Sequence, residues 1–217
     1  METKKKITAI CGWAVPSAWF KETVMSSFPK CDVRAVYPNS PLDSKEAKQI
    51  LLNDESDLYI GYSIGSLWLL FHKELIPQRS AKALIAPILS FIKEDKRGGK
   101  TPSAQLLYFL KTLRKNPEDS ESLINFFAKC NLPKGEKLLG NIPENDILLK
   151  GLEFLRDIKI EGEQTEGFMA FLGDKDPFLD LKIKEYIPQL EVVNDCDHAP
   201  NKLLDALANR PLWNNGN

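Results

Sequence analysis

The chain has 217 residues, of which 43% are hydrophobic and 27% are charged, a mixture typical of a folded domain of ordinary size. This composition excludes a disordered chain, a collagen and a coiled coil. The 29 Lys and Arg residues nearly balance the 30 Asp and Glu residues, and the net charge of -1 argues against a globally basic nucleic-acid-binding protein.

Six short apolar segments have the composition of buried strands, because they are rich in Ile, Val, Leu and aromatic residues. In chain order they are 7–13, 33–37, 58–62, 82–87, 167–173 and 190–195. Helical patterns lie between most of them, at 17–28, 44–53, 65–75, 178–186 and 200–209. This alternation predicts an α/β fold with a mostly parallel sheet of about six strands and helices on both faces.

The alternation is interrupted after the fourth predicted strand, where residues 88–165 are largely helical. We expect this segment to be a lid inserted into a core made of residues 1–87 and 166–217. Its charge is polarised, since residues 88–115 carry seven bases and two acids, whereas residues 116–166 carry six bases and eleven acids. Either the two halves attract each other, or the basic half docks an acidic partner.

Three features bear on the location of the protein. Lys4 to Lys6 and the apolar stretch that follows imitate a signal peptide, but Gly12 and Pro16 interrupt the stretch, which fits a strand and a turn better. The four cysteines are scattered without a C-x-x-C pair, and no run of 18 apolar residues is present. We therefore expect a cytoplasmic protein with free thiols, no metal site and no membrane span, and we expect it to be a monomer.

The strongest functional signal is the sequence GYSIG at residues 61–65, which directly follows one predicted strand and directly precedes a predicted helix. It matches the G-x-S-x-G nucleophile elbow, a sharp turn that exposes a serine hydroxyl so that a base can reach it. The flanking glycines let the backbone turn without a Cβ clash. We predict that Ser63 is the nucleophile of an acyl-transfer reaction.

Only two histidines can serve as the base. His72 lies inside the helix that follows the elbow and is expected to pack there. His198 follows the last predicted strand, at the carboxyl end of the sheet, where open α/β sheets place their sites. We therefore predict that His198 takes the proton of Ser63.

A carboxylate should orient this histidine and should lie between Ser63 and His198 in chain order. The turn after the fifth predicted strand offers Asp174 and Asp176, and we favour Asp176. Three other carboxylates remain as alternatives: Asp174, Asp180 and Asp195.

Two backbone N–H groups are candidates for an oxyanion hole. The first is that of Ile64, directly after the nucleophile, and the second is that of Trp13, in the turn after the first predicted strand. Gly12 would allow a close approach of this turn to a substrate. The Trp13 side chain is also expected to pack, which is compatible with the backbone role.

These residues resemble the α/β-hydrolase superfamily and, within it, the pimeloyl-[acyl-carrier protein] methyl ester esterases of biotin synthesis. Residues 11–14 (CGWA) are similar to that family's His-Gly-Trp-Gly turn, and GYSIG is similar to its Gly-Trp-Ser-Leu-Gly elbow. Residues 151–157 (GLEFLRD) resemble a helix that contains Gly-Leu-Glu-Ile-Leu. The family's Gly-x-x-Asp and His-Ala-Pro turns fall on residues 173–176 and 198–200, which selects Asp176 as the acid.

The resemblance implies hydrolysis of a methyl ester on an acyl chain that acyl carrier protein carries, without a metal or organic cofactor. Such a carrier is strongly acidic, so the basic stretch 93–115 becomes its expected docking surface. Phe109 resembles a lid aromatic that contacts the acyl chain. Neither nucleic acid nor a membrane is expected as a partner.

Three departures from the family pattern are present. Cys11 replaces the usual histidine, residues 37–41 replace an Asp-x-Pro-Gly stretch, and the chain begins at what would be the third strand, as in the short esterases of the pathway. Fold and catalytic residues do not fix the acyl or leaving group, so a thioesterase or a generalist short-chain carboxylesterase is an alternative. A non-catalytic small-molecule-binding protein on the same fold is a remote one.

Overall fold

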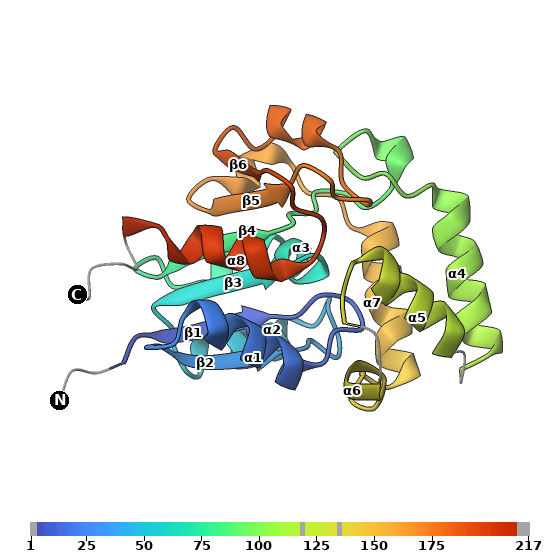
Figure 1. Ribbon diagram of the computed structural model, residues 1–217, viewed down its shortest axis with the longest axis horizontal. Helices are drawn as coiled ribbons and strands as arrows, with labels where there is room; N and C mark the ends of the chain where they lie inside the picture. Colours follow the sequence, from blue (N-terminus) through green and yellow to red (C-terminus); the bar gives the residue numbers. More distant parts are fainter. Residues whose placement is uncertain (1–3, 118–119, 134–135, 212–217) are drawn as a thin grey trace.

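The computed structural model describes residues 4–117, 120–133 and 136–211 (Figure 1). Six strands form one sheet in the order β2-β1-β3-β4-β5-β6, and all neighbouring strands are parallel. The strands are β1 (Lys6–Ile10), β2 (Asp32–Val36), β3 (Leu58–Tyr62), β4 (Ala81–Ile85), β5 (Met169–Gly173) and β6 (Leu190–Val193). The predicted six-stranded parallel sheet is confirmed.

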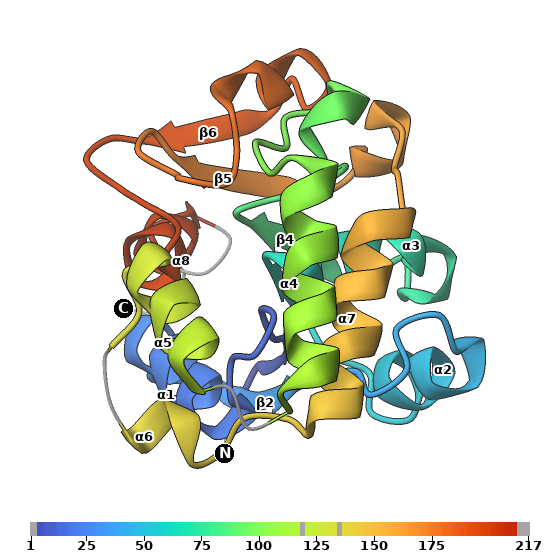
Figure 2. The ribbon, with the colours of Figure 1, turned by 90° about the vertical axis from the view of Figure 1, so that its right-hand side faces the viewer.

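Helices cover both faces of the sheet (Figure 2). Helices α1 (Ser17–Ser27) and α8 (Pro200–Ala208) lie side by side on one face, and α2 (Ser44–Leu52) and α3 (Ile64–Phe71) lie on the other. All five residues of β3 are buried, as are the first seven of α3. A strand enclosed in this way needs apolar side chains on both faces, which is why its sequence reads as a continuous apolar run.

The inserted segment 88–165, which we call the lid, lies beyond the carboxyl ends of the strands (Figure 1). Its helices are α4 (Ser103–Lys115), α5 (Ser120–Lys129), α6 (Glu136–Leu139) and α7 (Asn145–Asp157). Helices α4 and α7 pack along each other through amphipathic faces, with Leu106, Leu110 and Leu113 buried on α4. None of the helices in the described ranges combines the length and the apolar character that a membrane span requires.

Three ion pairs join the basic and acidic halves of the lid. Arg97 binds Glu161 through both terminal guanidinium nitrogens, at 2.6 and 2.7 Å, and the Lys159 ammonium lies 2.5 Å from the Asp95 carboxylate. Arg114 pairs with Glu153. The two halves therefore attract each other, as one of the two sequence interpretations expects, and Arg97 and Arg114 are engaged in ion pairs within the chain.

One predicted helix is wrong in type. The helical pattern at residues 178–186 corresponds in the structure to a shorter 3-10 helix at Leu181–Glu185. The Asp180 side chain accepts a hydrogen bond from the Lys182 N–H and caps this short turn. Two of its bonds span three residues, from Ile183 N–H to Asp180 O and from Tyr186 N–H to Ile183 O, as in a 3-10 helix.

Candidate active site

Ser63 lies in the sharp turn between β3 and α3, with φ 55° and ψ -118°. A positive φ is unfavourable for a residue with a side chain, and such strain is typical of functional turns. Both flanking glycines are required sterically, since a Cβ on Gly61 would lie 2.5 Å from the Gly65 carbonyl oxygen, and one on Gly65 would lie 2.3 Å from the Ile10 carbonyl oxygen. The predicted elbow geometry is present.

His198 lies in the loop between β6 and α8, and its imidazole reaches Ser63 from the other end of the chain. Its Nε2 is 3.0 Å from the Ser63 Oγ, and both side chains are buried. The Tyr62 hydroxyl donates a hydrogen bond of 3.0 Å to the His198 carbonyl oxygen, which fixes the backbone of the loop. His198 is therefore placed to accept the serine proton.

Asp176 orients this imidazole from the turn after β5. Its Oδ2 lies 2.7 Å from His198 Nδ1, and its Oδ1 accepts hydrogen bonds from the N–H groups of Phe178 and Leu179, at 2.8 and 3.0 Å. Burial disfavours the charged carboxylate, but the attraction of His198 and these hydrogen bonds outweigh it, so the pKa of Asp176 lies below its usual value. With the carboxylate charged, the imidazole keeps its proton on Nδ1, and Nε2 is free to accept one from Ser63.

The alternative acids have other partners. Asp174 accepts a hydrogen bond from the Cys196 N–H at 3.1 Å, Asp195 pairs with Lys175 at 2.6 Å, and Asp180 caps the 3-10 helix. The second histidine, His72, is buried at the end of α3, where its Nε2 lies 2.9 Å from the Pro41 carbonyl oxygen. The structure thus brings Ser63, His198 and Asp176 together and leaves the other candidates in structural contacts.

The two predicted oxyanion donors lie beside the nucleophile. Ile64 is the first residue of α3, where helix geometry leaves its N–H without an acceptor in the helix. Gly65 packs against the carbonyl groups of Ile10 and Cys11, so the turn that carries Trp13 lies against this end of α3. Within the described ranges, neither the Ile64 nor the Trp13 backbone N–H donates to a protein acceptor. Both are available to a developing negative charge.

Cys11, which stands where the pimeloyl esterases that this sequence resembles have a histidine, is fully buried behind this turn. Its N–H bonds to the Val36 carbonyl oxygen at 2.9 Å, and burial raises the pKa of its thiol far above the usual value. A neutral buried thiol behaves as a small apolar side chain. The turn is instead tied to the lid through the Trp13 indole, whose Nε1 donates a hydrogen bond of 2.9 Å to the Leu148 carbonyl oxygen on α7.

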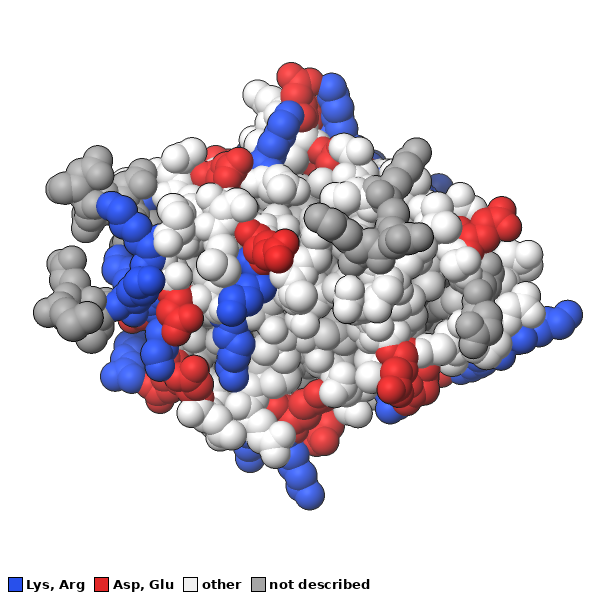
Figure 3. All heavy atoms as spheres, turned by 60° about the horizontal axis from the view of Figure 1, so that its bottom comes forward, with Lys and Arg blue, Asp and Glu red and all other residues white. Residues whose placement is uncertain are grey.

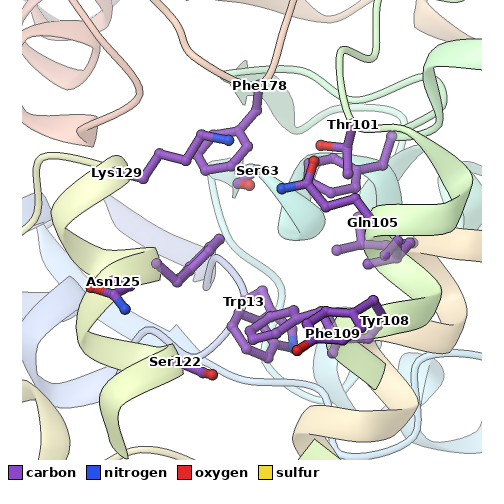
Figure 4. Close-up of a pocket in the computed structure, with 15 residues that line it drawn as sticks. Trp13, Ser63, Thr101, Gln105, Tyr108, Phe109, Ser122, Asn125, Lys129 and Phe178 are labelled. Atoms are coloured by element: carbon purple, nitrogen blue, oxygen red, sulfur yellow. The ribbon is translucent and has the colours of Figure 1, made fainter. Parts of the chain in front are cut away.

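Ser63 lies at the inner end of a pocket of about 410 Å³ between the core and the lid (Figure 4). The predicted substrate contact Phe109 lines this pocket, and its ring packs edge-on against Trp13, with 5.3 Å between centroids. The other apolar lining residues are Phe91, Leu106, Phe126, Leu152, Leu155 and Phe178. Such a pocket suits an acyl chain whose carbonyl group reaches Ser63.

Sequence reasoning missed three residues around the site. Phe178 packs its ring edge-on against His198, with 5.0 Å between centroids, and Lys129 lies above the same ring. The Lys100 ammonium donates a hydrogen bond of 2.6 Å to the Asp176 carbonyl oxygen. Phe178 could have been found from its place two residues after the acid, whereas the lysines come from the lid, and no motif marks them.

The arrangement can carry out nucleophilic acyl transfer, because a serine, a base, an orienting carboxylate and two oxyanion donors converge at one pocket. Among the described residues, no three His, Cys, Asp or Glu side chains are grouped in a way that could hold a metal ion.

Solved structures with the same architecture are known. One is an esterase (EaEST) from Exiguobacterium antarcticum, which is 12% identical over 96% of this chain and 92% of that chain, with a TM-score of 0.68. A lipase-esterase related protein from Clostridium acetobutylicum is 13% identical over 95% of each chain, also with a TM-score of 0.68. BioG from Haemophilus influenzae is 13% identical over 89% of this chain and 88% of that chain, with a TM-score of 0.55.

These similarities establish that the chain has the α/β-hydrolase fold. No protein-family model matches the chain, and no curated protein matches its sequence. At identities this low the shared feature is the fold, and activity has to be argued from the site itself.

Proposed function

We propose that the protein is a serine carboxylesterase that hydrolyses the methyl ester of pimeloyl-acyl carrier protein. The observation that carries the esterase part is the continuous hydrogen-bonded chain from Ser63 through His198 to Asp176, which begins at the inner end of an apolar pocket. Because Ser63 also adopts the strained backbone of a nucleophile elbow, a chance grouping of three polar residues is a poor explanation.

In the proposed reaction, His198 Nε2 takes the proton of Ser63 as Oγ attacks the ester carbonyl carbon. The N–H groups of Ile64 and Trp13 stabilise the negative oxygen of the tetrahedral intermediate. The C–O bond to the methoxy group then breaks, and His198 returns the proton to it, so that methanol leaves. Water, deprotonated by His198, attacks the acyl-enzyme and releases the carboxylic acid and Ser63.

The choice of substrate is supported by the GLEFL helix together with the acid and histidine turns, which resemble the pimeloyl esterases. The GLEFL segment lies in α7, and two of its residues, Leu152 and Leu155, line the pocket. A pocket of about 410 Å³ with aromatic and aliphatic walls accommodates a chain of several methylene groups.

A carrier protein would dock through the basic lid stretch 93–115. Arg97 and Arg114 are engaged in ion pairs, and Lys100 donates to the Asp176 carbonyl oxygen. The other exposed lysines of this stretch would therefore carry the interaction: Lys93, Lys96, Lys111 and Lys115. On the face shown in Figure 3, acidic and basic side chains are mixed, and the densest group of Lys and Arg lies at the left of the view, away from the lid. Docking at the lid would therefore depend on these few lysines.

The test is hydrolysis of pimeloyl-acyl carrier protein methyl ester by the purified protein, with Ser63→Ala as the matched control and free methyl pimelate esters beside the carrier-bound one. Release of the acid that depends on Ser63 and is faster for the carrier-bound ester supports the proposal. Equal rates on carrier-bound and free esters indicate a generalist carboxylesterase. If no acid is released from either ester and Ser63 fails to react with an organophosphonate, the protein is a binding protein on this fold and the proposal is wrong.

A further inference from the structure

One wall of the pocket differs in chemistry from the rest. Ser122, Asn125 and Lys129 of helix α5 line the pocket, and their spacing of three and four residues places them along one side of the helix (Figure 4). Lys129 is the one lining residue with a charged side chain among those that the structure describes, and no Asp or Glu is found in that lining. The pocket therefore has an apolar interior and a cationic side.

The Lys129 ammonium is close to the catalytic residues. Its Nζ lies 4.7 Å from the centroid of the Phe178 ring, and that ring packs edge-on against the His198 imidazole at 5.0 Å. A single aromatic ring thus separates the cation from the base. The cation–π contact holds the ammonium in position but leaves its positive charge uncompensated.

The charge of Lys129 also lacks a carboxylate partner among the described residues, in contrast to three other basic residues of the lid. Arg97, Arg114 and Lys159 each pair with an acid. A lone cation at the edge of an apolar pocket attracts anions into it, because the apolar walls weaken the screening by water.

We propose that Lys129 binds an anionic group of the substrate, a carboxylate or a phosphate, at the pocket mouth while the ester lies at Ser63. The inference rests on the proposed esterase function and makes it specific, since the substrate then carries its ester and its negative charge at separate positions. Asn125, one helical turn before Lys129, offers an amide N–H to the same group. Such a group can be the free carboxylate of a diacid half-ester or the phosphate of the carrier's prosthetic arm.

The experiment compares kcat/KM for pairs of esters that differ in charge. One pair is the monomethyl esters of four- to seven-carbon diacids and the methyl esters of monoacids of the same length. The other is the methyl ester of pimeloyl-pantetheine with and without its terminal phosphate. The variants are Lys129→Met, which removes the charge, and Lys129→Arg, which keeps it. The matched control is Lys48→Met on α2, an exposed lysine outside the pocket lining.

In the parent protein we expect kcat/KM to be about fivefold to tenfold higher for the anionic ester than for its uncharged counterpart in one of the two pairs. This is the scale of a charge-assisted hydrogen bond at a partly exposed site. Lys129→Met should abolish this preference, while Lys129→Arg and Lys48→Met should keep it. Loss in the diacid pair identifies a carboxylate, and loss in the pantetheine pair identifies the phosphate. An unchanged preference in Lys129→Met, while Ser63-dependent hydrolysis persists, overturns the inference. Absence of Ser63-dependent hydrolysis instead refutes the proposed function.

Discussion

Replacing Asp176 by Asn separates the charge of this side chain from its shape, and the structure predicts how the amide will orient. Asp176 Oδ1 accepts two backbone N–H groups, from Phe178 and Leu179. The amide oxygen of Asn must take this place, because the NH₂ group would otherwise face two donors. The NH₂ group then faces His198 Nδ1, which must accept its hydrogen bond.

An imidazole that accepts at Nδ1 carries its proton on Nε2, the nitrogen that lies 3.0 Å from Ser63 Oγ. It can then no longer take the serine proton. We expect kcat to fall by roughly 10⁴, about 5 kcal/mol of transition-state stabilisation, as in other triads with this change. The assay is hydrolysis of a p-nitrophenyl ester, with circular dichroism to verify the fold.

Asp174→Asn is the matched control. Asp174 accepts a hydrogen bond only from the Cys196 N–H among the described contacts, and an amide oxygen can accept that bond equally well. Its kcat should stay within about threefold of the parent, since a surface change of this kind costs little. The tautomer argument is refuted if Asp176→Asn keeps a tenth or more of the parent kcat, or if both variants lose activity equally.

Two further predictions concern titration. Cys11, Cys130 and Cys196 are buried, and burial raises the pKa of their thiols, that of Cys196 to about 11. A disulfide reagent at about pH 8 should therefore label Cys31 first and the other thiols only after unfolding. Rapid labelling of all four thiols in the native protein would contradict the described packing. The Asp176 carboxylate, with its lowered pKa, contributes stability that is complete above its ordinary pKa of 3.8 and is lost as pH falls through the folded-state value. Urea unfolding should therefore show the parent losing stability relative to Asp176→Asn on acidification from about pH 6 to about pH 3; a constant difference would mean that the carboxylate is not selectively stabilised.

Much of the core was predictable because its segments are enclosed on both faces. Every residue of β3 is buried, so its sequence has to be apolar throughout, and the GYSIG turn follows it with glycines that the backbone demands. Placement of Ser63, Asp176 and His198 at one edge follows from parallel strands, whose carboxyl ends meet. The 3-10 helix at 181–185 was missed, because hydrophobic spacing over five residues does not distinguish it from an α-helix.

The lid was predictable only as helical. Amphipathic patterns identify its helices, but their packing angles depend on side-chain contacts from distant parts of the chain. For this reason the charge asymmetry of 88–115 and 116–166 could not show that Arg97 and Arg114 pair with acids of the second half. The same limit hid Lys129, whose proposed role depends on its place above Phe178.

Trp13 joins the two parts of the site and shows how the lid can influence catalysis. Its backbone N–H is a candidate oxyanion donor, while its indole donates to Leu148 on α7 and packs edge-on against Phe109 and Phe126, at 5.3 and 4.8 Å between centroids. A shift of the lid helices would therefore act on the turn that carries this candidate donor. In the proposed reaction, the core provides the nucleophile and base at the strand ends, whereas the lid lines the substrate pocket and holds the turn of one candidate oxyanion donor. Substrate preference and rate should consequently change together when α4, α5 or α7 is altered.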